Sequence, residues 1–528
     1  AANHFQTVCA RAQVRRATLN LIHSPAGWPD PHGPATGFFQ NIRTMKCKPL
    51  FFAVFLFIAS TIFAQKYDYN WIGMAPNSDW RGALLKFEED TFSVEVFTDS
   101  RSVIFFSSHS LAISDYHGRL QFFTNGNAIA SWDNTLMENG TGLNDSAPIA
   151  DTTEDTWMIP PYATPSFTGI PDTENPYVYY LLHQFIDNNG IPTSTGMQIT
   201  KIDMSKNNGK GRVEYKNRFL NHGSFHYSFQ AIKHGNGRDW WIIQKTPESM
   251  NYLATLLHRD SVVTQIWSSI DGFQQNHLDS LGSSAHSLII SSPEGDFLID
   301  YSIYYPEPVA KLMHFDRCSG QITLVDTIQT AVIRNFLCNG INEPQLLYYW
   351  TMSFSPSERY MYGFGTRGVG RWDMKASDFK STFEEIYKTT DCSGMLPTGW
   401  LVPAPNGDLF DIYLNVHFRL RNPDQPASAS DICYPHYFTP SCIGADEYYF
   451  FNPLYPNYRL GPLEGSPCDT LNLEPPGEAP GEEWTLSVGP SPAASSFTVR
   501  LGQGDAATRP TALRVYDVLG RRLYDLPL

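Results

Sequence analysis

Short apolar and aromatic runs, each preceded by a turn signal, recur between residues 67 and 451, and no long stretch has the 3.6-residue period of an amphipathic helix. Gly, Pro and Asn–Gly supply the backbone angles of tight turns, whereas β-branched and aromatic residues suit a pleated sheet. The runs are therefore expected to be strands joined in hairpins. Six of these turns are centred on Gly118, Pro176, Gly237, Gly295, Ser357 and Gly407.

These six turns are separated by 58, 61, 58, 62 and 50 residues. A recurrence near this length is typical of repeat folds, and blades of roughly 40–50 residues are the usual β-propeller case. Together with the strand-like stretch 79–104, the pattern predicts an all-β β-propeller of six or seven blades. Two stacked β-sandwiches are the alternative, but their turns recur every 8–12 residues or so without a longer period.

The composition changes after this body, which we place at residues 65–472. Residues 473–483 form a Pro/Gly/Glu linker that cannot build a hydrophobic core. Residues 484–528 contain three further strand-like runs, and we expect them to form a small, incomplete β-sandwich tail.

The N-terminal region contains the three parts of a secretory signal peptide. Residues 45–64 begin with two lysines, continue into the apolar run 50–59 and end in the small residue Ala64. Cleavage is expected between Ala64 and Gln65. The apolar run is shorter than the roughly twenty residues of a membrane-spanning helix, so no transmembrane anchor is expected in the mature chain.

Residues 1–44 precede this signal and are rich in arginine. An organelle transit peptide is one interpretation of such a leader. We interpret the stretch instead as an upstream extension that is not native, with translation starting at Met45.

Composition and charge limit the classes of function. Of 528 residues, 42% are hydrophobic, 14% aromatic and 17% charged, which indicates a folded chain biased towards β structure. The formal net charge is −15, and residues 1–64 carry five net positive charges, so the mature chain carries −20. Because nucleic acid and anionic membranes require a basic face, neither is an expected partner.

The cysteines point to an oxidising compartment. Six remain after the predicted cleavage, and an even number in an exported protein suggests disulfides. They are Cys318, Cys338, Cys392, Cys433, Cys442 and Cys468. Spacing alone leaves the pairing open; short-range pairs Cys318–Cys338 and Cys433–Cys442, with Cys392–Cys468, are the hypothesis. The cysteine spacings do not form two CxxC pairs, so a zinc site is not expected.

One short segment has the spacing of a weak calcium loop. Asp203, Ser205, Asn207 and Glu214 occupy ligand positions 1, 3, 5 and 12 of such a loop, but the glycine required at the sharp turn comes one residue late. We therefore interpret the segment as a polar hairpin tip, and expect neither a metal nor a cofactor.

No catalytic motif is present: there is no His-Glu-x-x-His and no Gly-x-Ser-x-Gly, so no catalytic residue is assigned. Trp240 and Trp241 are candidates for stacking on a sugar ring. Successive residues of a strand face opposite sides, so one of the two indoles is expected to pack between blades.

The tail resembles the C-terminal sorting domain of the type IX secretion system. The resemblance rests on a Pro-x-Pro opening, Pro490 and Pro492, and on a later strand that ends in a Gly-Arg turn. The residues of that second motif are Tyr516, Asp517, Gly520 and Arg521. The resemblance implies export through the periplasm by the type IX machinery, removal of this domain, and secretion or attachment to the cell surface.

The body resembles secreted propeller-type proteins of bacteria that use this system. The resemblance lies in Lys233–Trp241, in Ile202–Met204 with Gly209–Gly211, in Phe354–Ser357 and in the closing segment Pro456–Asp469. It implies a fold and a location but no agreed activity.

The leading hypothesis is a secreted or surface-exposed, non-catalytic propeller that binds an unknown extracellular glycan or protein. The alternative is a propeller enzyme that cleaves a glycan or peptide with channel-lining carboxylates, which glycosidases hold at a defined separation; a structural envelope protein is a third hypothesis. A channel mouth with two or three buried carboxylates favours the enzyme, and a plugged channel favours the binding module.

Overall fold

The computed structural model describes most of residues 65–469 and several short strands outside that range. The described residues are 11–12, 17–20, 65–74, 81–89, 91–104, 110–143, 167–186, 194–226, 228–246, 251–270, 287–302, 309–329, 331–338, 341–365, 368–388, 400–413, 416–425, 432–433, 450–451, 455–469, 486–489, 496–501, 511–516 and 522–527. The chain divides into two compact units, residues 64–472 and residues 1–63 with 473–528.

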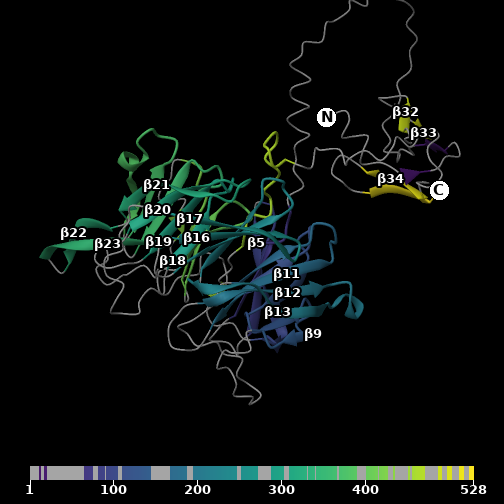
Figure 1. Ribbon diagram of the computed structural model, residues 1–528, viewed down its shortest axis with the longest axis horizontal. Coiled ribbons are helices and arrows are strands. Elements are labelled where there is room, and N and C mark those ends of the chain that lie inside the picture. Colours follow the sequence, from purple (N-terminus) through teal and green to yellow (C-terminus); the bar gives the residue numbers. More distant parts are fainter. Residues whose placement is uncertain are drawn as a thin grey trace, which may run out of the picture. The chain divides into compact units, whose positions relative to one another are not determined.

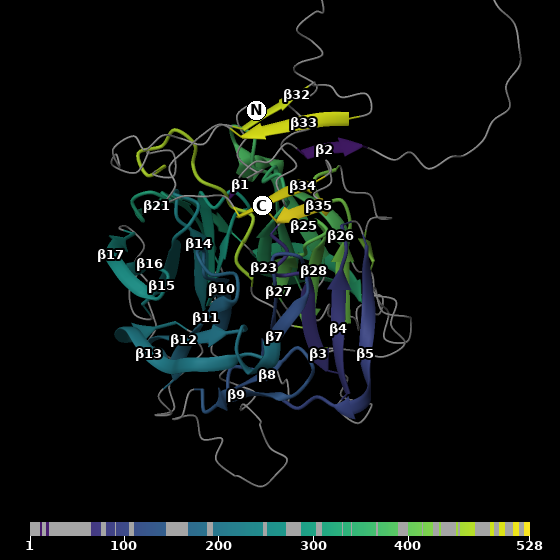
Figure 2. The same cartoon turned by 90° about the vertical axis from the view of Figure 1, so that its right-hand side faces the viewer.

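The described strands of residues 64–472 form seven groups, the blades of a β-propeller (Figures 1 and 2). Pairing within each group is antiparallel, and one parallel pair, Arg212 opposite Glu138, joins the outer strands of blades 2 and 3 into an eight-stranded sheet. Blade 1 contains β31 (Phe450–Phe451), β3 (Asn70–Met74), β4 (Arg81–Phe87) and β5 (Phe92–Arg101); blade 2 contains β6 (Leu111–Ser114), β7 (Leu120–Thr124), β8 (Ala128–Ser131) and β9 (Leu136–Thr141). Blade 3 contains β10 (Phe167–Pro171), β11 (Val178–Ile186), β12 (Ser194–Asp203) and β13 (Arg212–Phe225); blade 4 contains β14 (Phe229–Lys233), β15 (Trp240–Lys245), β16 (Asn251–His258) and β17 (Ser261–Ser269).

The remaining three blades follow the same order. Blade 5 contains β18 (Ser287–Ser291), β19 (Phe297–Ser302), β20 (Val309–Phe315) and β21 (Ile322–Gln329); blade 6 contains β23 (Ile341–Phe354), β24 (Tyr360–Gly365), β25 (Gly368–Asp373) and β26 (Glu384–Lys388); blade 7 contains β27 (Trp400–Pro403), β28 (Leu409–Tyr413), β29 (Val416–Leu420) and β30 (Ile432–Cys433). The prediction of an all-β propeller is confirmed, with seven blades.

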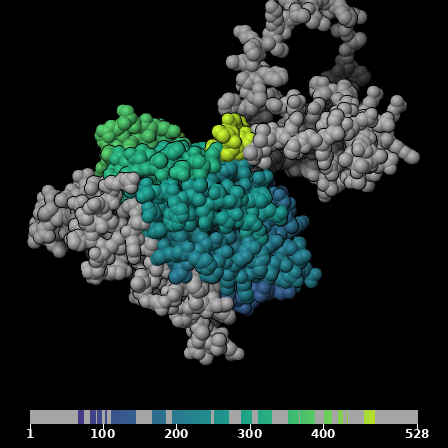
Figure 3. Space-filling model, in the orientation of Figure 1, coloured from purple at the N-terminus to yellow at the C-terminus, as the bar shows by residue number. Residues whose placement is uncertain are grey.

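The ring closes where the end of the body meets its beginning. The short strand β31 pairs with β3, Gly73 opposite Phe451 and Met74 opposite Phe450, so distant parts of the sequence complete one blade. The first strands of several neighbouring blades touch: β6 contacts β10, β14 contacts β18 and β23 contacts β27. These first strands therefore surround the central channel. In their common orientation, Figures 1 and 3 show blades 3, 4 and 5 following one another along one side.

The six predicted turns each join the first and second strands of one blade, in blades 2 to 7. In the turns at Gly118, Gly237, Gly295 and Gly407, the glycine has positive φ and its N–H donates to the carbonyl three residues earlier. Glu358 adopts the same conformation in blade 6, with φ 57°. The repeated turns thus all lie at one end of the channel.

The core lies between blades rather than within one layer, because both faces of each sheet are covered by a neighbour. Even-numbered residues of β15 such as Trp240 and Ile242 pack with Tyr180 of blade 3, whereas Trp241 and Ile243 pack towards blade 5. This alternation is the two-residue period of a strand.

Further elements extend the blades. β22 (Ala331–Cys338) pairs with the first half of β23 in a hairpin that projects from the body (Figure 1). Two short 3-10 helices, η1 (Asn207–Gly209) and η2 (Phe379–Thr382), lie in the turns of blades 3 and 6.

The second unit contains two small sheets. β32 (Leu486–Gly489) and β33 (Ser496–Leu501) pair with β2 (Ala17–Asn20), and β34 (Thr511–Tyr516) and β35 (Arg522–Pro527) pair with β1 (Arg11–Ala12). The tail strands are therefore joined by residues from the stretch that we interpret as an upstream extension.

Candidate functional site at the central channel

A segment without regular secondary structure crosses the turn end of the channel. We call residues Tyr455–Asp469 the strap. The Tyr455 hydroxyl lies 2.9 Å from the Asn70 carbonyl oxygen in blade 1 and 2.6 Å from the Ala112 carbonyl oxygen in blade 2. The Tyr458 hydroxyl donates to the Gly169 carbonyl oxygen in blade 3 at 2.5 Å. Burial raises the pKa of both tyrosines, so both hydroxyls keep their protons.

The strap is also bonded to blades 4 and 5. The Lys233 ammonium donates to the Tyr458 carbonyl oxygen at 2.6 Å, and the Leu463 N–H donates to the Gly235 carbonyl oxygen at 2.8 Å. Arg317 donates to the Gly461 carbonyl oxygen at 2.7 Å. The strap is therefore hydrogen-bonded to five of the seven blades, and Tyr455 also packs against Val402 and Phe410 of blade 7.

Lys233 is a cation inside this contact. Its side chain is 3% exposed, and it also donates to the Gln65 side-chain oxygen at 2.8 Å. Burial, with the nearby guanidinium groups of Arg317 and Arg459, lowers the pKa of Lys233 to about 7.

Arg459 of the strap forms an ion pair with Asp68, just before blade 1. Two guanidinium nitrogens lie 2.7 and 2.9 Å from the two carboxylate oxygens of Asp68. Burial alone would lower the pKa of Arg459, but the Asp68 carboxylate outweighs it and raises the pKa. This bidentate geometry uses both oxygens of the Asp68 carboxylate.

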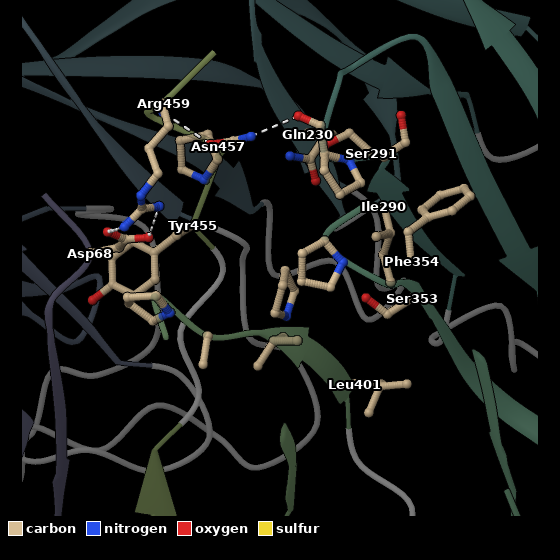
Figure 4. A pocket seen from close by; sticks show the side chains of 18 of the residues that line it. Asp68, Gln230, Ile290, Ser291, Ser353, Phe354, Leu401, Tyr455, Asn457 and Arg459 are labelled. Carbon is tan, nitrogen blue, oxygen red and sulfur yellow. Dashed lines mark hydrogen bonds and ion pairs between the residues drawn. The ribbon is translucent and has the colours of Figure 1, made fainter. Parts of the chain in front are cut away.

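A cavity of about 280 Å³ remains beside the strap, between it and the first strands of blades 4 to 7 (Figure 4). Its walls are largely apolar, and its polar lining includes Gln230, Ser291, Ser353 and Asn457. Among the described residues that line it, Asp68 is the one carboxylate, and Arg459 neutralises it. The described lining thus offers one carboxylate, where glycoside hydrolysis commonly uses two.

A second group of charges is sealed between blades 4 and 5. One Asp300 oxygen lies 2.8 Å from the Lys245 ammonium and 3.3 Å from that of Lys311, and it accepts from the Tyr252 hydroxyl at 2.5 Å. Although burial alone would raise it, the two ammonium groups hold the pKa of Asp300 below its usual range. The three charged side chains are at most 2% exposed, which suits an internal brace more than a contact with substrate.

The residues of the weak calcium-loop candidate lie at and beside the turn between β12 and β13, where they bond to neighbouring residues. The Asp203 carboxylate accepts from the Ser205 N–H and hydroxyl, and Glu214 pairs with Arg212 at 2.7 Å. Asn207 has a positive φ of 49° within η1. Within the described part of the chain, no group of three or more His, Cys, Asp or Glu side chains is placed to hold a metal ion.

The burial of Trp240 and Trp241 contradicts their candidate role in stacking on a sugar ring. The two side chains are 2% and 1% exposed, so neither presents a ring face to a ligand. Opposite orientation on the strand holds as expected, but in a propeller both directions lead into an interface between blades.

The proposed cysteine pairing is wrong for two of its three bonds. Cys318 is bonded to Cys468, with Cα atoms 5.5 Å apart and a sequence separation of 150 residues, which excludes Cys318–Cys338 and Cys392–Cys468. Cys392 and Cys442 lie outside the described residues, and Cys338 and Cys433 are described in backbone only. The bond ties the end of the strap to the turn between β20 and β21.

The structure does not test the predicted signal-peptide cleavage site or the predicted sorting motif of the tail. Ala64, Pro490, Pro492, Asp517, Gly520 and Arg521 lie outside the described residues, and Tyr516 is described only as the last residue of β34. Among the described residues, there is no helix of the length and apolar character that a membrane crossing requires.

The sequence analysis noted the closing segment Pro456–Asp469 but did not predict that it crosses the channel or which residues it contacts. The strap has no periodic pattern, and its signal was a run of Pro, Gly and Tyr ending in a cysteine. Asp68 belonged to no motif, and Lys233 was noted only within the segment of family resemblance, because the role of both depends on a segment more than 220 residues further along the chain.

No family model matches this sequence, and no curated protein matches it. Among solved structures, the periplasmic gluconolactonase of Pseudomonas aeruginosa is similar at 9% identity, covering 73% of this chain and 99% of that one with a TM-score of 0.32. A protein from Lactobacillus plantarum is 10% identical over 70% of this chain and 94% of its own, with a TM-score of 0.35. The Dos1 propeller is 9% identical over 72% and 86%, with a TM-score of 0.35. At these identities and scores, no activity carries over to this chain.

Proposed function

We propose that this chain is an exported, non-catalytic β-propeller that binds an extracellular glycan or protein at the cell surface or in the medium. The observation that carries the proposal is the strap, which crosses the turn end of the channel and is hydrogen-bonded to five blades. In the remaining cavity the single lining carboxylate is held by Arg459, so the described lining offers no acid–base pair.

Export is supported by three features that do not depend on one another. They are the signal-like residues 45–64, the resemblance of the tail to a type IX sorting domain, and the Cys318–Cys468 disulfide, since such bonds persist in oxidising compartments. In the cytoplasm a structural disulfide of this kind is rare.

The test of export is expression of the whole gene in a bacterium with type IX machinery, followed by fractionation and intact-mass measurement. A surface or extracellular species that begins at Gln65 is expected. The full 528-residue chain in the cytoplasm is the opposite result and removes the proposal.

The test of binding without catalysis uses that exported protein with insoluble extracellular polysaccharides and proteins. Co-sedimentation without new reducing ends or new amino termini is expected. Product release that disappears in Asp68→Asn would instead establish the propeller enzyme, because Asp68 is the described carboxylate in the cavity.

A further inference from the structure

The cavity beside the strap has rigid walls. Its lining includes five prolines, contributed by the turns of blades 5, 6 and 7, by the end of β27 and by the strap. They are Pro293, Pro356, Pro403, Pro405 and Pro456. Proline fixes one backbone angle and has no N–H, so these walls are preformed and offer few backbone donors. A preformed site binds with little ordering cost.

Unused hydrogen-bonding groups face this cavity. Ser353, on the inner strand β23, is 1% exposed and lines the cavity, and its hydroxyl has no hydrogen bond to any described residue. Ser291 on β18 is half-buried and also lines the cavity, and its hydroxyl likewise has no hydrogen bond to a described residue. The Gln230 amide on β14 donates only to the neighbouring Ala231 carbonyl. Figure 4 shows these three side chains across the cavity from Asp68, Tyr455 and Arg459.

Asn457 differs from these three residues. Its amide nitrogen donates to the Pro293 carbonyl oxygen at 2.7 Å, and its side-chain oxygen accepts from the Arg459 N–H at 3.0 Å. Asn457 therefore shapes the strap, whereas Ser353, Ser291 and Gln230 remain to bind a ligand.

The cavity is electrically neutral along its described lining. Asp68 and Arg459 are the charged side chains there, and each is the other's partner at 2.7 Å. An ionised ligand group would lose its hydration without gaining a free counter-charge, which is unfavourable. The site therefore selects an uncharged ligand.

Size and chemistry narrow the ligand further. At about 280 Å³ the cavity is slightly smaller than the roughly 300–1,000 Å³ of typical ligand pockets, so it admits one ring-sized group. An apolar side chain of a protein partner would leave the buried Ser353 hydroxyl without a partner, which is costly. A sugar ring offers hydroxyl groups to Ser353, Ser291 and Gln230 and its C–H face to the apolar wall.

We propose that this cavity binds a single neutral sugar residue, such as the terminal residue of an extracellular glycan. The proposal rests on the proposed function and specifies its ligand. Ser353 and Ser291 supply hydroxyl contacts, and Gln230 supplies an amide contact.

The experiment is saturation-transfer NMR and calorimetry on the exported protein with free monosaccharides at millimolar concentration. The probes are glucose, galactose, mannose and N-acetylglucosamine, with glucuronate as the charged counterpart and N-acetyl-tryptophanamide as the side-chain counterpart. We expect at least one neutral sugar to bind and the two counterparts not to bind.

Three variants locate the site. Ser353→Ala removes one hydroxyl and should weaken sugar binding about five- to tenfold, the worth of one hydrogen bond. Ser353→Leu fills the cavity and should abolish binding, and Ser291→Ala tests the same wall without adding volume. Ser269→Leu, at an exposed position on β17, is the matched control and should leave binding unchanged.

Several results overturn the inference. They are binding of N-acetyl-tryptophanamide in place of the sugars, preference for glucuronate, no binding by any neutral sugar, or sugar binding that Ser353→Ala and Ser291→Ala leave unchanged. If the exported protein still sediments with an extracellular ligand in these cases, the sugar-binding inference is wrong but the proposed function stands. Cytoplasmic location or product release is instead the failure of the proposed function.

Discussion

The Lys233 ammonium lies 2.6 Å from the Tyr458 carbonyl oxygen and joins the first strand of blade 4 to the strap. Both residues are buried, and Lys233 in addition lies 5.5 Å from the centre of the Trp240 ring. A titratable cation thus sits where strap and blade meet, so the stability of this contact depends on pH.

The first prediction concerns that dependence. The pKa of Lys233 is lowered to about 7 in the folded chain, whereas in the unfolded chain it has its ordinary value of 10.5. Between these values the unfolded chain binds the additional proton, so stability rises with pH from about 7 to 10.5 by up to about 1.4 kcal/mol per pH unit. Below pH 7 both states are protonated and this contribution no longer changes.

The measurement is urea denaturation of the wild type and of Lys233→Met at pH 7, 8 and 9. The difference between the two proteins should change with pH, in favour of the wild type at the higher values. Two curves that stay parallel over this range would show that Lys233 does not titrate there.

The second prediction concerns the disulfide. Cys318–Cys468 closes a loop of 150 residues, for which loop entropy gives a contribution of about 5 kcal/mol. Cys318→Ser with Cys468→Ser should therefore lower stability by several kcal/mol and make the strap sensitive to protease. Limited proteolysis with mass mapping follows both effects.

Cys338→Ser is the control for this bond. The structure requires that the Cys318–Cys468 cross-linked peptide persist in that variant. A cross-linked peptide containing Cys318 and Cys338 in the wild type would contradict the structure and restore the pairing suggested by spacing.

The third prediction concerns the turn of blade 4 beneath the strap. Gly237 has φ +70°, and a Cβ there would lie 2.6 Å from the Pro462 backbone nitrogen. Gly237→Ala should cost about 1–3 kcal/mol, through backbone strain and displacement of the strap. Gly209→Ala is the matched control, because Gly209 has φ +84° but nothing within 4 Å of an added Cβ.

Chemical denaturation of the two glycine variants separates the causes. The loss common to both is the strain of positive φ, and the excess in Gly237→Ala is the contact with the strap. Equal losses would mean that the strap yields without cost at Pro462.

The fold was predictable because each blade repeats the same local chemistry. The turns at Gly295, Ser357 and Gly407 have similar sequences, each with a proline, and each gives the same hairpin at the same end of the channel. Strand geometry also predicted opposite orientations for Trp240 and Trp241. It did not predict that both are buried, because only the ring of blades covers both faces of every sheet.

The site was not predictable, because it depends on contacts between distant segments. Spacing left the cysteine pairing open, and the short-range pair Cys318–Cys338 was only a hypothesis. The ring instead brings the strap next to the blade 5 turn, so that Cys468 lies beside Cys318. Ser353 and Ser291 stand in ordinary strand patterns, and only the assembled channel turns them towards one cavity.

The last prediction concerns the ion pair that forms one wall of that cavity. Arg459→Met leaves the Asp68 carboxylate, in a residue 6% exposed, without its counter-charge and should cost about 3 kcal/mol or more. Asp68→Leu combined with Arg459→Met removes both charges and should recover much of that loss. Arg212→Met, at the exposed pair with Glu214, is the control and should leave stability unchanged. Urea denaturation of these variants and of Asp68→Leu alone completes a double-mutant cycle. If the losses in the free energy of unfolding of the two single variants simply add in the double variant, the two charges do not stabilise the strap together.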